Sequence, residues 1–255
     1  MLLENTTTTD LAEVCDDIEV AVFPVGSTEQ HGPALPLSTD SQSAESVAAG
    51  VSDRDDVVVL PTLPIGVSPH HRQFHGSLWV TEETFESFVR ETLESITAHG
   101  VEKAIIVNGH GGNVTSIERV SQDLYRDEIA FTVPWSWWEG VGDTPQEVLD
   151  DDVEVPGHAA GFEGSMMLHL AAELVREKRF EEAAKGVGDG SRFDHPAVRG
   201  YDFADWTDNG VHGDPRLADA DAGEALQQAS VTALEDLIDW LTDLPSETCR
   251  PRPHK

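Results

Sequence analysis

Short apolar runs with the composition of β-strands alternate with helix-like segments along most of this chain. The strand candidates are rich in valine and isoleucine, and they lie at Glu19–Val25, Val57–Leu60, Lys103–Val107 and Ile129–Val133. Strands that are separated by helices usually pair in parallel, and a parallel sheet needs helices on both of its faces. The alternation therefore predicts an α/β fold with a mainly parallel central sheet.

Helical periodicity is clearest between Glu82 and His99, where apolar residues recur at helical spacing. Thr81 can cap the start of this helix and Gly100 can end it. Further helices are expected at Ser41–Val51, Val114–Tyr125 and Leu226–Leu244, with Thr39 or Asp40 as the cap of the first. The sequence has neither an internal repeat nor a linker-like segment, so residues 1–255 are expected to form one domain.

The net charge of −32, from 48 acidic and 16 basic residues, is spread along the whole sequence. Nucleic acids and anionic membranes would repel such a chain, so neither is expected as a partner. Self-repulsion on this scale is screened at high ionic strength, and the distribution resembles that of proteins from extreme halophiles. An ordinary acidic surface is the alternative interpretation.

A cytoplasmic location is expected, because the sequence contains no apolar stretch long enough to span a membrane and begins without the pattern of a secretion signal. Cys15 and Cys249 form no pattern typical of disulfides or zinc knuckles.

The loop after the first strand candidate carries Glu29, His31 and Asp40. Residues two apart on an extended loop point to the same side, so Glu29 and His31 can converge on one ion, and Asp40 would lie at the start of the next helix. Two carboxylates and an imidazole suit Zn²⁺, Mn²⁺ or Fe²⁺ better than Ca²⁺. A solvated polar loop is the alternative.

A further candidate ligand, His110, lies in the turn NGHGGN directly after the Lys103–Val107 strand. The glycines around it let backbone and imidazole approach a ligand closely. Ligands of parallel sheets gather beyond the carboxyl ends of the strands, so this turn and the loop after Val25 should meet. An Asn-Gly turn with an incidental histidine is the alternative.

The segment GHAAGFEGS places His158 and Glu163 five residues apart, ahead of a helix. An imidazole and a carboxylate at this spacing could join the same site. For Glu163, the alternative is an acidic residue favoured by the positive end of the helix dipole.

Three segments, VGSTEQHGPALPLSTD, IIVNGHGGN and HAAGFEGS, resemble in order and separation the signature segments of the creatininase (creatinine amidohydrolase) family. HHRQFHGS and NGVHGDPRLADADAG agree with them, so the resemblance runs from about Val20 to Gly223. It implies a three-layer α/β/α domain, often assembled as a hexamer, which binds one or two divalent metal ions and hydrolyses amide-type C–N bonds. The expected substrate is a small molecule with a non-standard or cyclic amide, as opposed to a standard peptide bond.

The resemblance also implies roles for individual residues. Glu29, His31, Asp40 and His110 match metal ligands, with Asp40 as the bridge where two ions are present. Glu163 matches an acidic ligand of the second ion. His158 matches the histidine assigned to proton transfer.

A metal-activated water would attack the amide, with Glu163 or Asp40 orienting it. The N–H groups of Gly111 and Gly112 could stabilise the oxyanion, and a protonated His158 would release the leaving nitrogen. Two other side chains could contact the substrate, namely His71 in the segment after the second strand and Trp137 in the cluster Trp135, Trp137 and Trp138. The alternative for these tryptophans is a place in the core, and for His71 a polar loop residue without a ligand role.

The substrate is left open by two departures from the creatinine hydrolases. Those enzymes carry a tyrosine and a metal-binding glutamate where this chain has Gly111 and Gly112, and their FPGT-like segment reads Phe74-His75-Gly76-Ser77 here. Branches that resemble the HGGN turn more closely include formamide hydrolases (deformylases) acting on a pyrimidine nucleotide in riboflavin and F420 biosynthesis, and the mycofactocin-precursor peptidases. A metal-holding relative without catalysis, or a protein that uses metal only for assembly, are the non-enzymatic alternatives.

Overall fold

The computed structural model describes residues 1–149, 157–186 and 200–252. Its sheet has the strand order β2-β1-β3-β4, and all of its pairings are parallel. The strands are β1 (Val20–Val25), β2 (Val57–Val59), β3 (Lys103–Asn108) and β4 (Phe131–Ser136). The predicted α/β fold is therefore confirmed, and the described sheet is parallel throughout.

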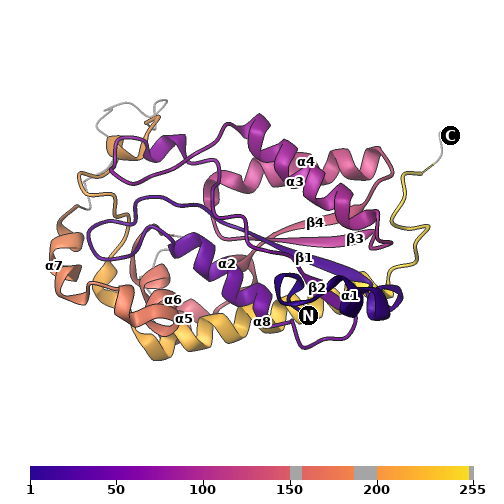
Figure 1. Ribbon diagram of the computed structural model, residues 1–255. Helices are drawn as coiled ribbons and strands as arrows, with labels where there is room; N and C mark the ends of the chain where they lie inside the picture. Colours follow the sequence, from indigo (N-terminus) through magenta and orange to yellow (C-terminus); the bar gives the residue numbers. More distant parts are fainter. Residues whose placement is uncertain (150–156, 187–199, 253–255) are drawn as a thin grey trace.

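Helices cover both faces of this sheet (Figure 1). One face carries α3 (Glu82–Thr97) and α4 (Val114–Arg126), with α1 (Thr8–Val14) at its margin. The other face carries α2 (Thr39–Ala49), α6 (Gly161–Ala171) and α8 (Ala220–Asp243). The short helices α5 (Thr144–Val148) and α7 (Phe180–Ala183) complete the set. These layers are the α/β/α arrangement that the resemblance implied.

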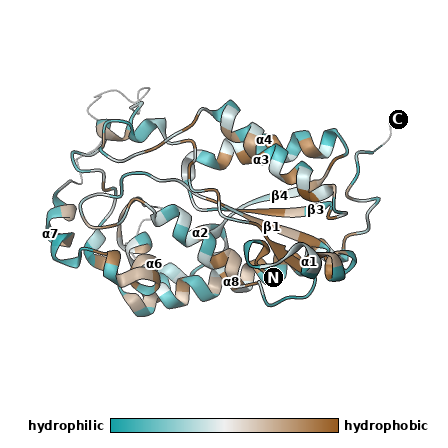
Figure 2. Cartoon of the chain, in the orientation of Figure 1, coloured by the Kyte–Doolittle hydropathy of each residue, from teal (hydrophilic) through white to brown (hydrophobic). Residues whose placement is uncertain are grey.

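The alternation of side chains along β1 explains why both faces must be covered. Ala21, Phe23 and Val25 enter the core beneath α3 and α4, whereas Val20 and Val22 enter the core beneath α2 and α8. All of these residues are buried. Figure 2 shows the same pattern, with apolar residues on the strands and polar residues on the outer sides of the helices.

Most predicted helices agree with the structure to within a few residues, and their ends have local causes. The Thr81 hydroxyl accepts a hydrogen bond from the Thr84 amide at the start of α3, as a capping threonine does. The prediction that Thr39 or Asp40 caps α2 is wrong, because Ser38 is the N-cap and both residues lie in the first turn. This first-turn position directs Asp40 into the interior, where it is 3% exposed.

The order of the strands creates a crevice at the carboxyl end of the sheet. From β1 the chain passes through α2 to β2 on one side, and from β3 it passes through α4 to β4 on the other side and the other face. The loops after β1 and β3 therefore diverge, and ligands of open parallel sheets bind in the gap between such loops. Within the described ranges, every helix is too short or too polar to cross a lipid bilayer.

Candidate active site

The loops after β1 and β3 bring Glu29, His31, Asp40 and His110 together beyond the carboxyl end of the sheet. All of them are at least 96% buried. The turn after β3 can lie this close to α2 only because residue 109 is glycine, since a Cβ there would stand 2.1 Å from the backbone oxygen of Asp40. Gly109, the first glycine of the NGHGGN turn, thus allows His110 to lie close to Asp40.

Asn113, the last residue of that turn, fastens three loops to one another. Its side-chain oxygen accepts a hydrogen bond from the Val67 amide at 2.9 Å, and its side-chain nitrogen donates to the Gly26 carbonyl at 3.1 Å. Asn108 holds the turn from within, because its side chain binds both the amide and the carbonyl of His110. The ligand geometry therefore rests on buried amide side chains.

Asp40 lies between two groups of possible metal ligands. Its Oδ2 atom is 3.1 Å from Nδ1 of His110, which in turn is 3.2 Å from Oε1 of Glu29. Its Oδ1 atom is 3.0 Å from Nε2 of His31, which lies 3.7 Å from Oε2 of Glu163. In each group the possible ligand atoms all lie within 4.8 Å of one another. One carboxylate is thus placed to bridge two cations.

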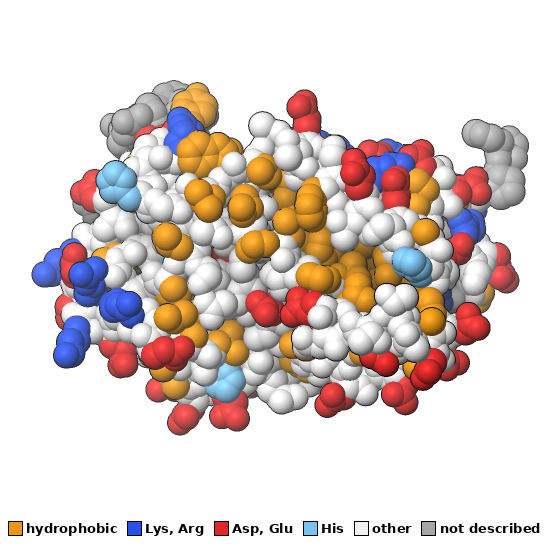
Figure 3. All heavy atoms as spheres, viewed as in Figure 1, with side chains coloured by type: hydrophobic (Ala, Val, Ile, Leu, Met, Phe, Trp, Pro, Cys, Tyr) orange, Lys and Arg blue, Asp and Glu red, His pale blue; other side chains and the backbone are white. Residues whose placement is uncertain are grey.

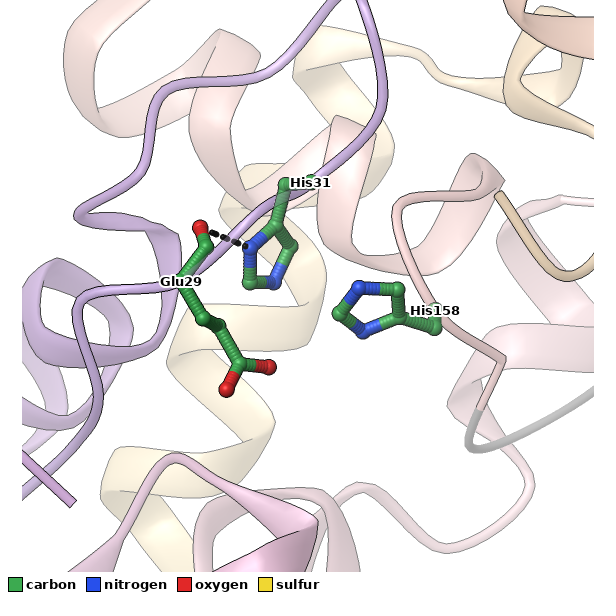
Figure 4. A group of neighbouring side chains, drawn as sticks. All are labelled: Glu29, His31 and His158. Atoms are coloured by element: carbon green, nitrogen blue, oxygen red, sulfur yellow. Dashed lines mark hydrogen bonds between the residues drawn. The ribbon is translucent and has the colours of Figure 1, made fainter. Parts of the chain in front are cut away.

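The hydrogen bonds of the two imidazoles leave their site-facing nitrogens as acceptors. Nδ1 of His31 lies 3.2 Å from the Glu29 carbonyl (Figure 4), and Nε2 of His110 lies 3.1 Å from the Val67 carbonyl. A carbonyl oxygen only accepts, so each of these nitrogens donates its proton. In the neutral form of each ring the remaining nitrogen, Nε2 of His31 or Nδ1 of His110, therefore faces the carboxylates with a lone pair, which a metal ion or a proton can occupy.

A cation is needed where so many acceptors face one another without a donor. In the metal-free chain that cation is a proton: burial lowers the pKa of His110, but Glu29 and Asp40 outweigh burial and raise it to about 10. At His31 burial likewise lowers the pKa, but Asp40 and Glu163 outweigh burial and raise it well above its ordinary value. Despite the short distances within the group, three of its buried atoms, Oε2 of Glu29, Nε2 of His31 and Oδ2 of Asp40, make no hydrogen bond of good geometry. The residues present therefore fit a pair of divalent metal ions.

A second network places two neutral histidines beside this cluster. The side-chain amide nitrogen of Gln30 lies 2.9 Å from Nδ1 of His71 and donates to the Gly210 carbonyl at 3.1 Å. Nε2 of His158 donates to the backbone carbonyl of Gln30 at 2.9 Å. Burial lowers the pKa of His71 and of His158, and neighbouring histidines lower both further. Both imidazoles are therefore uncharged in the resting protein.

The loop before α6 fixes His158 and Glu163 relative to each other. The backbone of His158 exchanges two hydrogen bonds with that of His212, at 2.8 and 2.9 Å. Ala159, which lies between His158 and α6 in the chain, adopts a left-handed conformation with φ of 54°. Its amide donates to Oε2 of Glu163 at 2.5 Å. A non-glycine residue in this region costs about 1–2 kcal/mol, which these bonds offset.

A cavity of about 220 Å³ opens onto both networks. Its lining contains carboxylates, histidines and aromatic side chains; the described residues around it are Glu29, Asp40, His70, His71, Gly109, His110, Gly111, Gly112, Trp138, Gly157, His158, Phe162, Glu163, Phe203 and His212. His31 lies behind Asp40 and has no exposed surface. The structure thus brings the predicted ligands, His158, His71 and both glycines to one place.

Comparison with known proteins agrees with this geometry. The family model "Creatininase: Creatinine amidohydrolase" matches residues 4–238. The mycofactocin precursor peptide peptidase of Mycolicibacterium smegmatis is 32% identical over 236 residues, which cover 89% of this chain and 87% of that protein. The chain belongs to the creatininase family.

A curated relative and a solved structure agree with this family assignment in activity class and in fold, respectively. The creatinine amidohydrolase of Pseudomonas putida is 27% identical over 175 residues, or 61% of this chain and 66% of that one. A solved mutant creatininase of the Zn–Zn type has the same fold, with a TM-score of 0.80 and 23% identity over 95% of this chain and 98% of the other. The predicted family, fold and enzyme class, an amidohydrolase, are thereby confirmed.

The turn after His110 separates this chain from the creatinine hydrolases in a physical way. A Cβ on Gly112 would stand 2.2 Å from the Val67 carbonyl oxygen and 2.4 Å from Nε2 of His110. The glutamate that the creatinine hydrolases carry here would not fit without a shift of the backbone. Gly111, by contrast, has open space around its missing side chain.

Trp137, which was predicted to contact the substrate, does not line the cavity. It is 1% exposed and stacks on Phe162 in the core between the sheet and α8, with ring centroids 4.7 Å apart. Its neighbour Trp138 lines the cavity instead. Trp137 is therefore a core residue, as the alternative interpretation held, and Trp138 is the tryptophan that reaches the cavity.

Sequence reasoning missed Gln30 and Phe203. Gln30 stands between Glu29 and His31, and it contacts both neutral histidines: its side chain binds His71, and its backbone carbonyl accepts a hydrogen bond from His158. The period of two that predicted the ligands could have revealed it. Phe203 lines the cavity from a segment far along the chain, and only the tertiary fold brings it there.

Proposed function

We propose that this creatininase-family protein hydrolyses an amide C–N bond with two divalent metal ions, held by Glu29, Asp40 and His110 at one position and by His31, Asp40 and Glu163 at the other. The observation that carries the proposal is the orientation of His31 and His110, whose lone pairs face the shared carboxylate of Asp40. Zn²⁺ and Mn²⁺ suit this set of nitrogen and carboxylate donors, and Fe²⁺ is the third candidate.

Bound metal would supply Lewis acidity, which lowers the pKa of a water molecule and polarises the amide carbonyl. Glu163 has one oxygen occupied by the Ala159 amide, which leaves the other to orient the water. His158 is neutral at rest, so it first accepts a proton and then delivers it to the departing nitrogen. The N–H groups of Gly111 and Gly112, in the turn before α4, would bind the developing oxyanion.

A phosphate-free, peptide-like amide is the substrate class that the cavity favours. Its described lining contains Glu29, Asp40 and Glu163 but neither lysine nor arginine, so none of these lining residues is the lysine or arginine that usually binds a nucleotide phosphate. This argues against the formamidopyrimidine nucleotide of the deformylases. Creatinine is disfavoured because Gly112 replaces the glutamate of its hydrolases and leaves no room for one. The similarity to a peptide peptidase supports the same choice.

Metal analysis combined with a small substrate panel tests this proposal. Purified protein should contain tightly bound divalent metal, and Asp40→Asn should lose both ions, whereas the exposed matched control Asp239→Asn should keep them. Short peptides, creatinine and a formamidopyrimidine nucleotide form the panel, and peptide hydrolysis should disappear with a chelator. Activity that survives both metal removal and His110→Ala would refute the metal-dependent mechanism.

Two outcomes of the same experiment would identify the non-enzymatic alternatives. A ligand-binding relative would keep its metal and hydrolyse none of the amides. A protein that uses metal for assembly alone would dissociate on chelation, again without turnover. Neither alternative requires the neutral His158 beside the cluster, which is why the enzyme is preferred.

We also propose that the chain forms a homo-oligomer, with the hexamer of the family as the model. Apolar side chains gather across one face of the molecule (Figure 3), and Leu78, Trp79 and Phe88 are each about half exposed. Such patches are typical of protein contacts. The net charge of −32 supports function at high ionic strength, and a cytoplasmic location stays a prediction from the sequence.

A further inference from the structure

The segment Gly200–Trp206 closes one side of the cavity with an aromatic ring. Phe203 stands over both neutral histidines, with ring centroids 4.5 Å from His71 and 4.7 Å from His158. It also lines the cavity itself. One side chain therefore contacts the substrate-facing histidine, the proton-transfer histidine and the space that the substrate would occupy.

Asp202 ties this segment to the loop that carries His71. Arg72 and Gln73, the two residues after His71, both donate to the Asp202 carboxylate; the bond from Nη2 of Arg72 is 2.5 Å long and that from Nε2 of Gln73 is 2.6 Å long. Nη1 of Arg72 makes a second bond, so the ion pair is bidentate. Phe203, the next residue, contacts the His71 ring. The two segments are therefore joined at the rim of the cavity both by the ion pair and by this ring contact.

The backbone of the segment is shaped to hold this position. Asp205 is buried and accepts hydrogen bonds from the amides of Tyr201 and Asp202 at 2.9 and 3.1 Å. Gly200 has a φ of 94°, and a Cβ there would stand 2.9 Å from Nε1 of Trp206. The segment is therefore a compact turn held by its own hydrogen bonds as well as by Arg72.

We infer that Phe203, held by the junction of Arg72, Gln73 and Asp202, is the specificity-determining residue that shields His71 and His158 from water and binds an apolar group beside the scissile amide. Trp138 and Phe162 line the same cavity, so the apolar group would be enclosed by aromatic rings. Exclusion of water around His158 protects the proton that it transfers. The apolar subsite rests on the proposed function, whereas the shielding of the histidines does not.

Modification by diethyl pyrocarbonate, followed by peptide mass spectrometry, measures the shielding without any turnover. The reagent attacks neutral imidazoles, and exposed His99 serves as an internal reference in every sample. In Phe203→Ala the rates at His71 and His158 should rise by at least about tenfold, whereas Phe203→Leu should restore most of the protection. Phe88→Ala, which removes an exposed phenylalanine from α3, is the matched control and should change neither rate.

Loss of the junction should have a smaller effect in the same direction. Arg72→Ala should raise both rates by about two- to fivefold, because Arg72 is half exposed and such ion pairs are weak. Arg126→Ala, which removes an exposed ion pair of α4, should leave them unchanged. Unchanged rates in Phe203→Ala would overturn the shielding role.

The apolar subsite is tested by protection with two small amides, N-acetylphenylalaninamide and N-acetylglycinamide. In metal-loaded wild-type protein the first should protect His158 at a concentration at least about tenfold lower than the second. Phe203→Ala should abolish that difference. Equal protection by the two amides in the wild type would overturn the subsite, and it would leave both the shielding result and the metal-dependent activity to be judged by their own measurements.

Discussion

The two adjacent glycines after His110 offer a matched pair of substitutions that test how the metal site is built. Gly112→Ala would place a Cβ 2.2 Å from the Val67 carbonyl oxygen, more than an ångström inside the shortest ordinary contact of 3.4 Å. The same Cβ would stand 2.4 Å from Nε2 of His110, so it would break the hydrogen bond from that nitrogen to Val67. Gly111→Ala meets nothing within 4 Å.

The cost of Gly112→Ala follows from these contacts. Overpacking costs about 1–3 kcal/mol, and leaving the buried N–H of His110 without its acceptor costs about 1–3 kcal/mol more. For a chain of this size each 1 kcal/mol lowers Tm by roughly 2–4 °C, so a combined cost of about 2–6 kcal/mol should lower Tm by about 4–24 °C. Displacing His110 should also weaken metal binding by about 10- to 100-fold. Gly111→Ala should stay within about 1 kcal/mol of the wild type.

Thermal unfolding and metal titration of the two variants decide the matter. Both should be measured in a chelator and in excess Mn²⁺, so that stability and metal affinity are separated. Equal Tm values for Gly111→Ala and Gly112→Ala, or full metal affinity in Gly112→Ala, would show that the Val67 contact does not position His110.

Three other outcomes are expected. In metal-free protein burial lowers the pKa of His110, but Glu29 and Asp40 raise it to about 10, so its protonated form stabilises the fold. This contribution is complete below the ordinary pKa of 6.5 and is lost as the pH rises through about 10; Tm in chelator should fall across that range, and a flat profile would contradict it. Gln30→Ala, which removes the side-chain partner of His71 but keeps the backbone carbonyl that binds His158, should lower kcat by about 10- to 100-fold while metal content stays normal; a loss of metal instead would assign Gln30 to the ligand site. Raising KCl from about 0.1 M to about 2 M should increase Tm, because salt screens the charge of −32, and a decrease would argue against the halophilic interpretation.

The sequence alone determined the layers of the fold and most of the ligand set. Strand composition and helical spacing predicted the parallel sheet, and Glu29, His31, Asp40 and His110 were recognisable because they follow strands that end at the same edge. Such local signals are short-range: side-chain periodicity and glycine-rich turns depend on neighbouring residues only.

Tertiary structure alone decided which nitrogen of His110 faces the site and which aromatic residue reaches the cavity. The tautomer of His31 depends on the carbonyl of Glu29, only two positions away, whereas that of His110 depends on the carbonyl of Val67, 43 positions away in the chain. Phe203 reaches His71 through the pairing of Asp202 with Arg72, two residues that lie 130 positions apart. Contacts at such separations form when distant segments pack together, and a single sequence carries no periodic trace of them.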